Sequence, residues 1–507
     1  MALIKEFRIP HQGYNPTTDY SASLQNHYPY RRLIKRSIDS RGRKVVFVLK
    51  YECSTSDFEG PISEPIPLKQ VDAHNKVHII GAGPAGYFAA LQAISLGIKP
   101  IIFERGKPVR ERRRDLAQLV KNHVVNPESN YCFGEGGAGT YSDGKLYTRS
   151  KKRGDVKAVL ATLVQYGADA DILIDAHPHI GTNKLPQIIE NLRETIIDHG
   201  GEIHFESKLT NFTLNNNKVE SIVINEIETI ATENVVLATG HSADDIFHLL
   251  KANKVDIAFK PFALGFRIEH PQSWVDNIQY HGIKNDVLPP AAYSLVTQTE
   301  QKGVFSFCMC PGGIIAPCAT GDRQVVTNGW SPSKRNNEYA NSGFVAEIGE
   351  KDIDPKHGPL GGLYLQRAIE EKAWKMAGES QKAPAQMATD FVNNRIGELS
   401  NCSYIPGVVA CNLNELFPKN ITKALRDALI EFDKKMPGYI KNGMIIAPET
   451  RTSSPVQVLR DPRNLNSTSA SNLYPCAEGA GYAGGIISAA IDGMRCVKAL
   501  GQAHMTE

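Results

Sequence analysis

One glycine-rich turn constrains this chain more than any other feature of its 507 residues. The segment GAGPAG, which contains Gly81, Gly83, Pro84, Ala85 and Gly86, follows the apolar run VHII directly and precedes the helical pattern YFAALQAISLG. A strand, the spacing GxGxxG and a helix form a dinucleotide-binding turn, in which glycine permits a tight turn and lets backbone N–H groups approach a pyrophosphate. The sequence therefore predicts an α/β fold with a Rossmann-like domain.

A second predicted strand, KPIIFERG, ends at Glu104. This residue lies about 20 positions beyond the glycine turn, where a carboxylate accepts hydrogen bonds from an adenosine ribose. Arg105 follows at the start of a basic stretch, and we expect one or two arginines of that stretch to reach the phosphates of the nucleotide.

FAD and NAD share this turn, and three further segments favour FAD, because a flavin needs contacts along its ribityl chain and ring. FGEGGAGTYSDGK places glycines around Thr140 and Ser142, so its backbone can lie close to a flat ring. VVLATG is a buried strand ending in a glycine turn, and CAEGAGYAGGII places a carboxylate at a strand end before a helix. The predicted contacts in these segments are Gly136, Gly137, Thr140, Gly240, Glu478, Gly481, Gly484, Gly485 and Ile486.

The segment GAGYAGG, residues 479–485, also fits a dinucleotide pattern. The alternative interpretation is that it forms a separate NAD site. The residues after it suffice for one helix but not for a second βαβ unit with its own acidic residue. We therefore expect this segment to complete the flavin site. NADH or NADPH stays open as a transient electron donor.

Longer motifs carry a resemblance to known proteins. GAGPAG with a strand-ending Glu, VVLATG and LYPCAEGAGYAGGIISAAIDG resemble the flavoprotein superfamily of the fumarate reductase and glutathione reductase types. FGEGGAGTYSDGKL, ATGHSADDIF, KPFALGFRIEHPQ, FCMCPGG and ETRTSSPV resemble, more narrowly, a bacterial family of uncharacterised FAD-dependent dehydrogenases. This second similarity covers almost the whole chain after residue 70.

The resemblance implies roles for particular residues. Glu478 should bond the ribityl hydroxyls, and Arg112 is the arginine expected at the FAD phosphates. The helix starting near Gly485 should point its N-terminus at the pyrimidine carbonyl of the flavin, where its positive end would stabilise the anionic reduced ring. The resemblance supplies no substrate.

Shifts of pattern along the chain predict three regions. Residues 1–70 form a small N-terminal α/β domain and linker, in which YPYRRLIKRSI is expected to be a helix. Residues 71–250 and 465–507 form the FAD-binding domain, which is discontinuous in sequence. Residues 251–464 form an inserted α+β domain that caps the flavin and binds substrate.

Composition limits the function classes. A net charge of +3 over 507 residues is too balanced for wholesale binding to nucleic acid or an acidic membrane. Nine cysteines without a CxxC pair indicate a reducing compartment. The sequence contains no apolar run of about 18 residues, so we predict no membrane span. We therefore expect a cytoplasmic protein that acts on a small-molecule substrate and has no membrane or nucleic-acid partner. The sequence gives no prediction of its oligomeric state.

Three residues are the candidates for substrate chemistry. Arg451 lies in a polar loop just before the chain returns to the FAD domain, and its guanidinium could bind a carboxylate or phosphate through two hydrogen bonds. Arg267 and His270, in FALGFRIEHPQ, form a charged pair expected to face inward. A structural role for each of the three is the competing interpretation.

Cys308 and Cys310 form a close cysteine pair. They lack the further ligands that a metal site needs, so we expect no metal. A disulfide between residues i and i+2 of a regular strand would be strained. We therefore expect both to be buried structural thiols that electron transfer does not require.

These observations favour an FAD-dependent oxidoreductase in which the flavin exchanges a hydride with an unidentified small molecule, anionic molecules being among the candidates. The alternative is a flavin-containing protein that binds or modifies RNA through its basic clusters. A steep negative dependence of RNA binding on salt would identify the alternative. The clusters are Arg31, Arg32, Lys35 and Arg36; Arg105, Lys107, Arg110, Arg112, Arg113 and Arg114; and Arg149, Lys151, Lys152 and Arg153.

Overall fold

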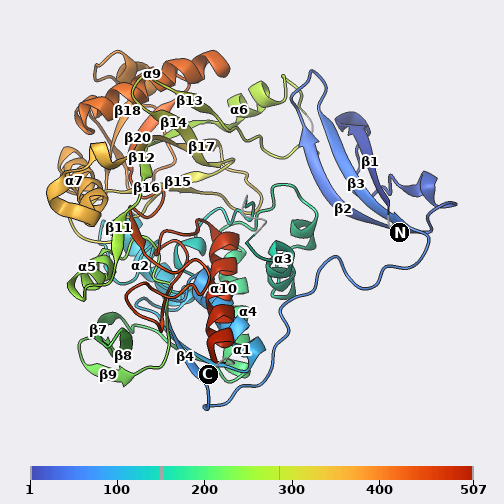
Figure 1. Ribbon diagram of the computed structural model, residues 1–507. Helices are drawn as coiled ribbons and strands as arrows, with labels where there is room; N and C mark the ends of the chain where they lie inside the picture. Colours follow the sequence, from blue (N-terminus) through green and yellow to red (C-terminus); the bar gives the residue numbers. More distant parts are fainter. Residues whose placement is uncertain (1–2, 149–152, 285, 505–507) are drawn as a thin grey trace.

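The computed structural model describes residues 3–148, 153–284 and 286–504. Figure 1 shows two larger bodies of helices and strands, one above the other, with a small N-terminal sheet beside them. The lower body contains both the strand before the glycine turn and the C-terminal helix, so segments far apart in the sequence lie side by side there.

The lower body is built on a parallel sheet with the strand order β22-β10-β4-β5-β6. Its strands are β4 (Lys76–Ile80), β5 (Lys99–Phe103), β6 (Glu202–His204), β10 (Val235–Leu237) and β22 (Leu473–Pro475). The central strands are apolar, as expected where both faces of a parallel sheet are covered. The helices of this body are α1 (Pro84–Leu96), α2 (Val109–Asn122), α3 (Val156–Gln165), α4 (Leu185–Asp198) and α10 (Ile486–His504).

The glycine turn determines how α1 begins and how α10 packs on it. Proline occupies the first turn of α1, where its fixed φ suits a helix start, and Gly97 ends the helix with a φ of 80°. A Cβ on Gly493 would lie 2.1 Å from the carbonyl oxygen of Ala85, so α10 can lie against α1 only with glycine at that position. The C-terminal helix thus backs the nucleotide-binding turn.

An antiparallel sheet extends the lower body. Its strands are β7 (Leu209–Asn215), β8 (Lys218–Ile224) and β9 (Glu228–Ala231), and α5 (Asp244–Ala252) lies against β7. Asn216 and Asn217 join β7 to β8 with φ values of 46° and 58°, a backbone conformation that asparagine tolerates well. The two strands thus form a β-hairpin.

The upper body is built on a seven-stranded mixed sheet with the order β13-β14-β17-β12-β20-β18-β19. The strands are β12 (Phe262–Pro271), β13 (Val296–Gln298), β14 (Gly303–Cys310), β17 (Tyr339–Ile348), β18 (Ala383–Met387), β19 (Val408–Ala410) and β20 (Met444–Glu449). Its helices are α6 (Gln272–Gln279), α7 (Gly361–Met376), α8 (Ala388–Val392) and α9 (Lys419–Lys435). Two small sheets join it, β11 (Ile257–Phe259) with β21 (Val456–Val458), and β15 (Ile314–Pro317) with β16 (Thr327–Trp330).

The N-terminal segment forms an antiparallel sheet, β1-β3-β2, made of β1 (Leu3–Pro10), β2 (Tyr30–Asp39) and β3 (Val46–Ser54). The helix predicted for YPYRRLIKRSI is wrong: from Tyr30 onward these residues form strand β2. Its apolar residues pair along β3, and this tertiary pairing outweighs a helical spacing that is only local. Arg36 attaches the sheet to the lower body through ion pairs of 2.6 Å to Asp171 and 2.7 Å to Asp175.

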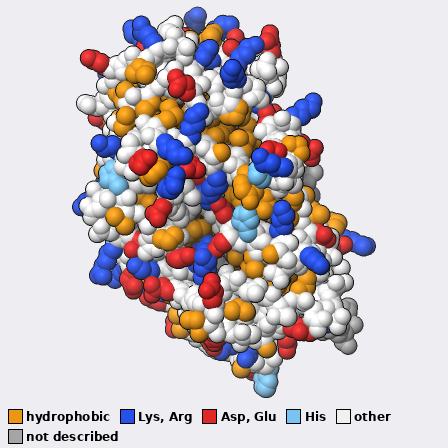
Figure 2. All heavy atoms as spheres, turned by 90° about the vertical axis from the view of Figure 1, so that its left-hand side faces the viewer, with side chains coloured by type: hydrophobic (Ala, Val, Ile, Leu, Met, Phe, Trp, Pro, Cys, Tyr) orange, Lys and Arg blue, Asp and Glu red, His pale blue; other side chains and the backbone are white. Residues whose placement is uncertain are grey.

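Several cations of the first two basic clusters form ion pairs within the molecule. Arg32 pairs with Glu52, Arg36 with two aspartates, and Arg110 with Glu190. On the face shown in Figure 2, Lys and Arg side chains are interspersed with Asp and Glu side chains. In the third cluster, Arg149, Lys151 and Lys152 lie outside the described residues. Among the helices described, none is long and apolar enough to cross a bilayer.

Candidate functional site

A cavity lies at the carboxyl ends of four neighbouring parallel strands. Gly81 follows β4, Glu104 follows β5, Gly240 lies shortly after β10, and Glu478 lies shortly after β22. Ligands of open α/β sheets bind at this edge. The upper body closes the cavity with Phe307, Cys308, Asn328, Arg451 and Thr452.

The structure separates the predicted FAD contacts into two groups. Those that line the cavity are Gly81, Gly83, Pro84, Ala85, Glu104, Arg105, Gly137, Gly240, Glu478, Gly485 and Ile486. Those that do not line it are Gly86, Arg112, Gly136, Thr140, Gly481 and Gly484. Of this second group Arg112 and Thr140 are fully buried, whereas Gly484 is exposed.

The glycines of the turn serve different physical needs. A Cβ on Gly86 would lie 1.9 Å from the carbonyl oxygen of Gly81, and a Cβ on Gly81 would lie 2.5 Å from that of Ala238. Gly83 differs, because its nearest neighbour at the same position would be the Cα of Gly137, at 3.9 Å. The protein itself therefore leaves room for a side chain at Gly83, and the open space faces the cavity at the N-terminus of α1.

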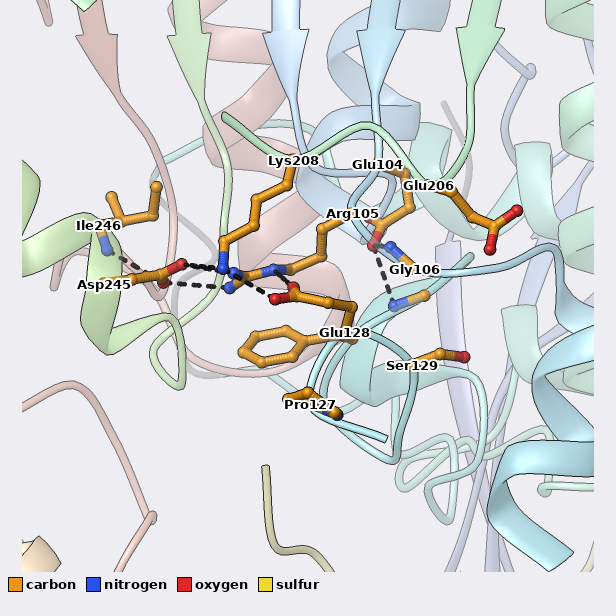
Figure 3. A network of polar contacts seen from close by, with 12 residues as sticks. Glu104, Arg105, Gly106, Pro127, Glu128, Ser129, Glu206, Lys208, Asp245 and Ile246 are labelled. Atoms are coloured by element: carbon orange, nitrogen blue, oxygen red, sulfur yellow. Dashed lines mark hydrogen bonds and ion pairs between the residues drawn. The ribbon is translucent and has the colours of Figure 1, made fainter. Parts of the chain in front are cut away.

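Glu104 holds the turn together. Its carboxylate accepts hydrogen bonds from the backbone N–H groups of Ala82 at 2.8 Å, Gly106 at 2.9 Å and Gly134 at 2.9 Å. Figure 3 shows Glu104 beside Gly106. The residue thus joins the glycine turn to the segment that begins near residue 133. Its contact with a ribose stays a prediction.

Arg105 is engaged by carboxylates and not free to bind phosphate. Its guanidinium donates to Glu128 at 2.7 Å and to Asp245 at 3.1 Å, and Lys208 pairs with both carboxylates (Figure 3). The guanidinium also lies over the ring of Phe133, 4.4 Å from its centre. We infer that this network forms a wall of the cavity, which corrects the expectation of a free phosphate-binding arginine.

Arg112 is fully buried and orders the glycine segment. Its Nε donates to the carbonyl oxygen of Asn130 at 2.7 Å, and its Nη1 donates to those of Glu135 at 2.8 Å and Gly137 at 2.9 Å. Its position behind the wall corrects the expectation that it lines the phosphate site. One nitrogen, Nη2, has no hydrogen-bond partner among the described residues.

The glycine segment is tied to the nucleotide-binding turn at the next positions. The N–H of Gly136 donates to the carbonyl oxygen of Ala82 at 2.8 Å, and the Thr140 hydroxyl donates to that of Glu135 at 2.8 Å. A Cβ on Gly136 would lie 1.9 Å from the Thr140 oxygen. These residues present Gly137 to the cavity.

Glu478 and the start of α10 form the opposite wall. Burial raises the pKa of Glu478 to about 7, although the charge of Lys260 opposes this shift. The side chain can therefore be protonated near neutral pH and donate to a hydroxyl. Gly485, with a φ of 84° and open space where a Cβ would stand, precedes Ile486 at the N-terminus of α10. This positive helix end lies at the cavity.

These walls fit the isoalloxazine, ribityl and diphosphate parts of FAD. The glycines at 83, 240 and 485 leave space on the cavity side that a Cβ would occupy. Two helix N-termini, those of α1 and α10, meet the same cavity and favour groups that carry negative charge. The donor set is thus complementary to an anionic dinucleotide.

Arg451 reaches the cavity but its guanidinium is already bound. Nε and Nη2 donate to the two oxygens of Glu370 at 3.0 and 2.9 Å, Nη1 donates to Thr320 at 2.8 Å, and Nη2 donates to Gln324 at 3.0 Å. The expectation of a fork free to grip an anionic substrate is therefore wrong. These bonds tie the loop that carries Thr452 to Glu370 of α7.

Arg267 and His270 are both fully buried in the upper body. Arg267 pairs with Glu449 at 2.8 Å and lies directly behind Cys308 and Cys310. His270 packs against the rings of Trp274 and Tyr439, and its Nε2 lies 2.8 Å from the carbonyl oxygen of Tyr439. Neither residue lines the cavity, which corrects the expectation that they meet the substrate.

The burial of His270 predicts a pH dependence of stability. Burial lowers its pKa to about 4. Between about pH 6.5 and pH 4, His270 binds a proton in the unfolded chain but not in the folded chain. The free energy of unfolding therefore falls as the pH falls. We expect His270 to account for a loss of about 2 kcal/mol between about pH 7 and pH 5. Urea unfolding of wild type and His270→Gln at both pH values measures this contribution, and equal losses in the two proteins would contradict it.

Several functional residues were missed by the sequence reasoning. Cys308 is exposed at the cavity and only Cys310 is buried, so the prediction of two buried thiols is wrong for Cys308. Lys145 lines the cavity beside both thiols, and its place at the end of the glycine segment was the available signal. His241 and Asn328 also line the cavity.

One cluster in the described residues has the composition of a metal site. Ligand atoms of Cys476, Asp492 and Cys496 lie within 4.8 Å of one another. The two Asp492 oxygens already accept hydrogen bonds from Arg460, at 2.8 and 2.9 Å, and one also accepts from the N–H of Ala477. The guanidinium supplies the positive charge that a metal would bring, so we assign no metal to this cluster.

By sequence, the chain is similar to one protein family and to one bacterial protein. Residues 261–452 match the family described as FAD-dependent protein, C-terminal domain-like. Over 488 residues the chain is 40% identical to an uncharacterised protein of Clostridium beijerinckii, and the alignment covers 91% of this chain and 90% of that protein.

Solved structures give a weaker similarity. The tetracycline destructase Tet(55) is 9% identical with a TM-score of 0.36, covering 88% of this chain and 82% of its own. A geranylgeranyl bacteriochlorophyll reductase-like protein of Thermoplasma acidophilum is 15% identical with a TM-score of 0.34, covering 85% of this chain and 79% of its own.

Proposed function

Because this chain belongs to the family of the Clostridium beijerinckii protein and contains the C-terminal region of FAD-dependent proteins, we propose that it is an FAD-dependent oxidoreductase. In this proposal FAD is held tightly and exchanges a hydride with a small molecule. Residues 71–250 and 465–507 bind the cofactor, and residues 251–464 cover it and select the substrate.

One observation carries the proposal. Segments from four distant parts of the chain, each following a parallel strand, meet at one cavity that also receives the N-termini of α1 and α10. The turn at Gly83 would hold the diphosphate, Glu104 the ribose, Glu478 the ribityl chain and Gly485 the ring. FAD supplies the hydride chemistry, and the protein orients the ring and controls what reaches it.

The substrate side is formed by the upper body. Phe307 and Thr452 line the cavity and also a second, open hollow that leads to the surface. We propose that substrate enters through this hollow. Its charged lining mixes Lys302 and Lys351 with Glu347 and Asp352, so it gives no support to a preference for anionic substrates.

The first expected result is a yellow protein that releases FAD and not FMN on denaturation, because the turn and Glu104 suit an adenosine diphosphate half. Absorption spectra of the purified protein and chromatography of the released cofactor measure this. A colourless protein that also fails to take up added FAD would refute the proposal.

The electron donor can then be found by anaerobic bleaching of the flavin. NADH and NADPH are the first candidates to add, followed by reoxidation of the reduced protein with a metabolite library. Bleaching by either nucleotide would make it the donor, and the metabolite that restores the yellow colour would be a candidate substrate.

A further inference from the structure

Two cysteines on the upper wall of the cavity are placed unlike structural thiols. Cys308 and Cys310 both belong to β14, but Cys308 is exposed at the cavity while Cys310 is buried behind it. The wall on which Cys308 lies faces the glycine segment and the start of α10, between which the proposed function places the flavin ring.

A bulge in β14 brings the two side chains together. Phe307 pairs with Gly343 and Cys310 pairs with Asn341, so three steps along β14 oppose two steps along β17. Cys308 has a φ of 44°, the left-handed conformation that accompanies such a turn of the strand. In a regular strand, residues i and i+2 lie about 6.6 Å apart, near the upper limit for a disulfide. The bulge turns this segment, so that the Cys310 thiol donates to the carbonyl oxygen of Cys308 at 3.2 Å and both sulfurs contact the same lysine nitrogen.

Positive charge is focused on the pair. The Lys145 Nζ lies 3.6 Å from the sulfur of Cys308 and 3.6 Å from that of Cys310. Arg267 lies behind them, with one nitrogen 2.9 Å from the carbonyl oxygen of Cys308 and 3.8 Å from the sulfur of Cys310. The hydrogen bond from Cys310 lowers the pKa of the Cys308 thiol well below its usual range, and Lys145 and Arg267 lower it further.

The other charged groups around the thiol pair favour a single negative charge on the two sulfurs. Asp143 is shared by Lys145 and Arg335, whose charges hold its pKa down against the effect of burial. Burial raises the pKa of Glu449, the partner of Arg267, to about 7. The pKa of Glu478, on the opposite wall, is also raised to about 7. Two cations, Lys145 and Arg267, thus contact the thiol pair, and among the three carboxyl groups only Asp143 has a lowered pKa.

We propose that Cys308 and Cys310 are a redox-active dithiol that exchanges two electrons with the flavin. In the reduced state the pair holds one thiolate and one thiol. Forming the Cys308–Cys310 disulfide releases two electrons and the thiol proton, and oxidised FAD takes up both electrons and that proton to give the anionic reduced flavin. Charge and atoms balance without a further reactant, and the reverse step reduces the disulfide.

This inference rests on the proposed function, but its first test does not. The wild-type protein is first reduced with dithiothreitol and freed of the reductant under anaerobic conditions. Iodoacetamide is then added, and mass spectrometry follows alkylation at each cysteine from about pH 8 to pH 6. We expect the rate at Cys308 to stay nearly constant, since its thiolate persists. The rate at Cys402, a half-buried thiol outside the cavity, should fall about tenfold per pH unit. In Lys145→Gln, Cys308 should acquire a steeper dependence.

The second test counts electrons. Anaerobic dithionite titration of the air-oxidised protein should consume four electrons per bound flavin in wild type and in the control Cys402→Ser, but two in Cys308→Ser. The wild-type peptide that contains both cysteines should be two hydrogens lighter before reduction than after it.

The outcomes separate the two proposals. A protein without flavin that still shows pH-independent alkylation of Cys308 refutes the FAD-dependent function and the electron exchange, but not the thiolate. A flavoprotein that takes up the same number of electrons in wild type and Cys308→Ser, with no disulfide in the wild-type peptide, overturns the dithiol alone. Equal alkylation profiles at Cys308 and Cys402 overturn the thiolate.

Discussion

Gly83→Val is expected to abolish FAD uptake while leaving the protein folded. A Cβ at this position meets only the Cα of Gly137, at 3.9 Å, so the apoprotein can accept the side chain. The valine methyl groups would instead occupy the space in which backbone N–H groups approach the pyrophosphate. Losing two charge-assisted hydrogen bonds, each worth about 1.5 to 3 kcal/mol, weakens binding by roughly a hundredfold or more.

Two variants control this experiment. Gly42→Val places the same side chain in open space on the N-terminal sheet and should bind FAD normally. Gly86→Val should lose the fold as well, because its Cβ would lie 1.9 Å from the carbonyl oxygen of Gly81. Circular dichroism reports the fold, and titration of apoprotein with FAD reports affinity. Normal FAD affinity in folded Gly83→Val would show that the pyrophosphate lies elsewhere.

The cofactor side of the cavity was predictable because its signals are local. A strand, a glycine turn and a helix follow one another directly, and the backbone demands glycine at Gly81 and Gly86 whatever the rest of the chain does. The parallel sheet then brings the ends of its strands to one edge, so Glu104, Gly240 and Glu478 could be placed together from sequence.

The arginines could not be assigned from sequence, because their partners lie far along the chain. Arg105 meets Asp245 across 140 positions, and Arg451 meets Glu370 across 81. A guanidinium that looks available in a polar loop is taken up by whichever buried carboxylate the fold brings near. Arg112 was assigned to the phosphates by resemblance and instead holds carbonyl groups of the neighbouring segment.

The exposure of Cys308 could not be predicted for a different reason. Reading β14 as a regular strand made a close pair of sulfurs look strained, and a bulge cannot be seen without the partner strand. Lys145 is 163 positions before Cys308, so no spacing rule joins them. The helix predicted near the N-terminus was wrong for a similar reason. The apolar residues of β2 do not reveal by their spacing that this segment pairs with β3.

Arg451→Ala is expected to destabilise the protein by about 3 kcal/mol, because it leaves a buried carboxylate without its main partner. Glu370 is 0% exposed and accepts two hydrogen bonds from Arg451. Breaking such a pair costs about 3 to 5 kcal/mol. The lower figure applies here, since Arg367 and Thr450 still donate to Glu370. Urea unfolding measures the loss, and Arg451→Lys should recover part of it.

A matched surface pair separates this effect from a general loss of charge. Arg323 and Glu371 are bonded at 2.8 Å, with 60% and 42% of their side chains exposed, so Arg323→Ala should cost less than about 1 kcal/mol. In the double variant Arg451→Met/Glu370→Gln, removal of both charges should restore much of the stability, because no buried charge is left unpaired. If Arg451→Ala were instead as stable as wild type and lost only turnover, its guanidinium would serve the substrate and not Glu370.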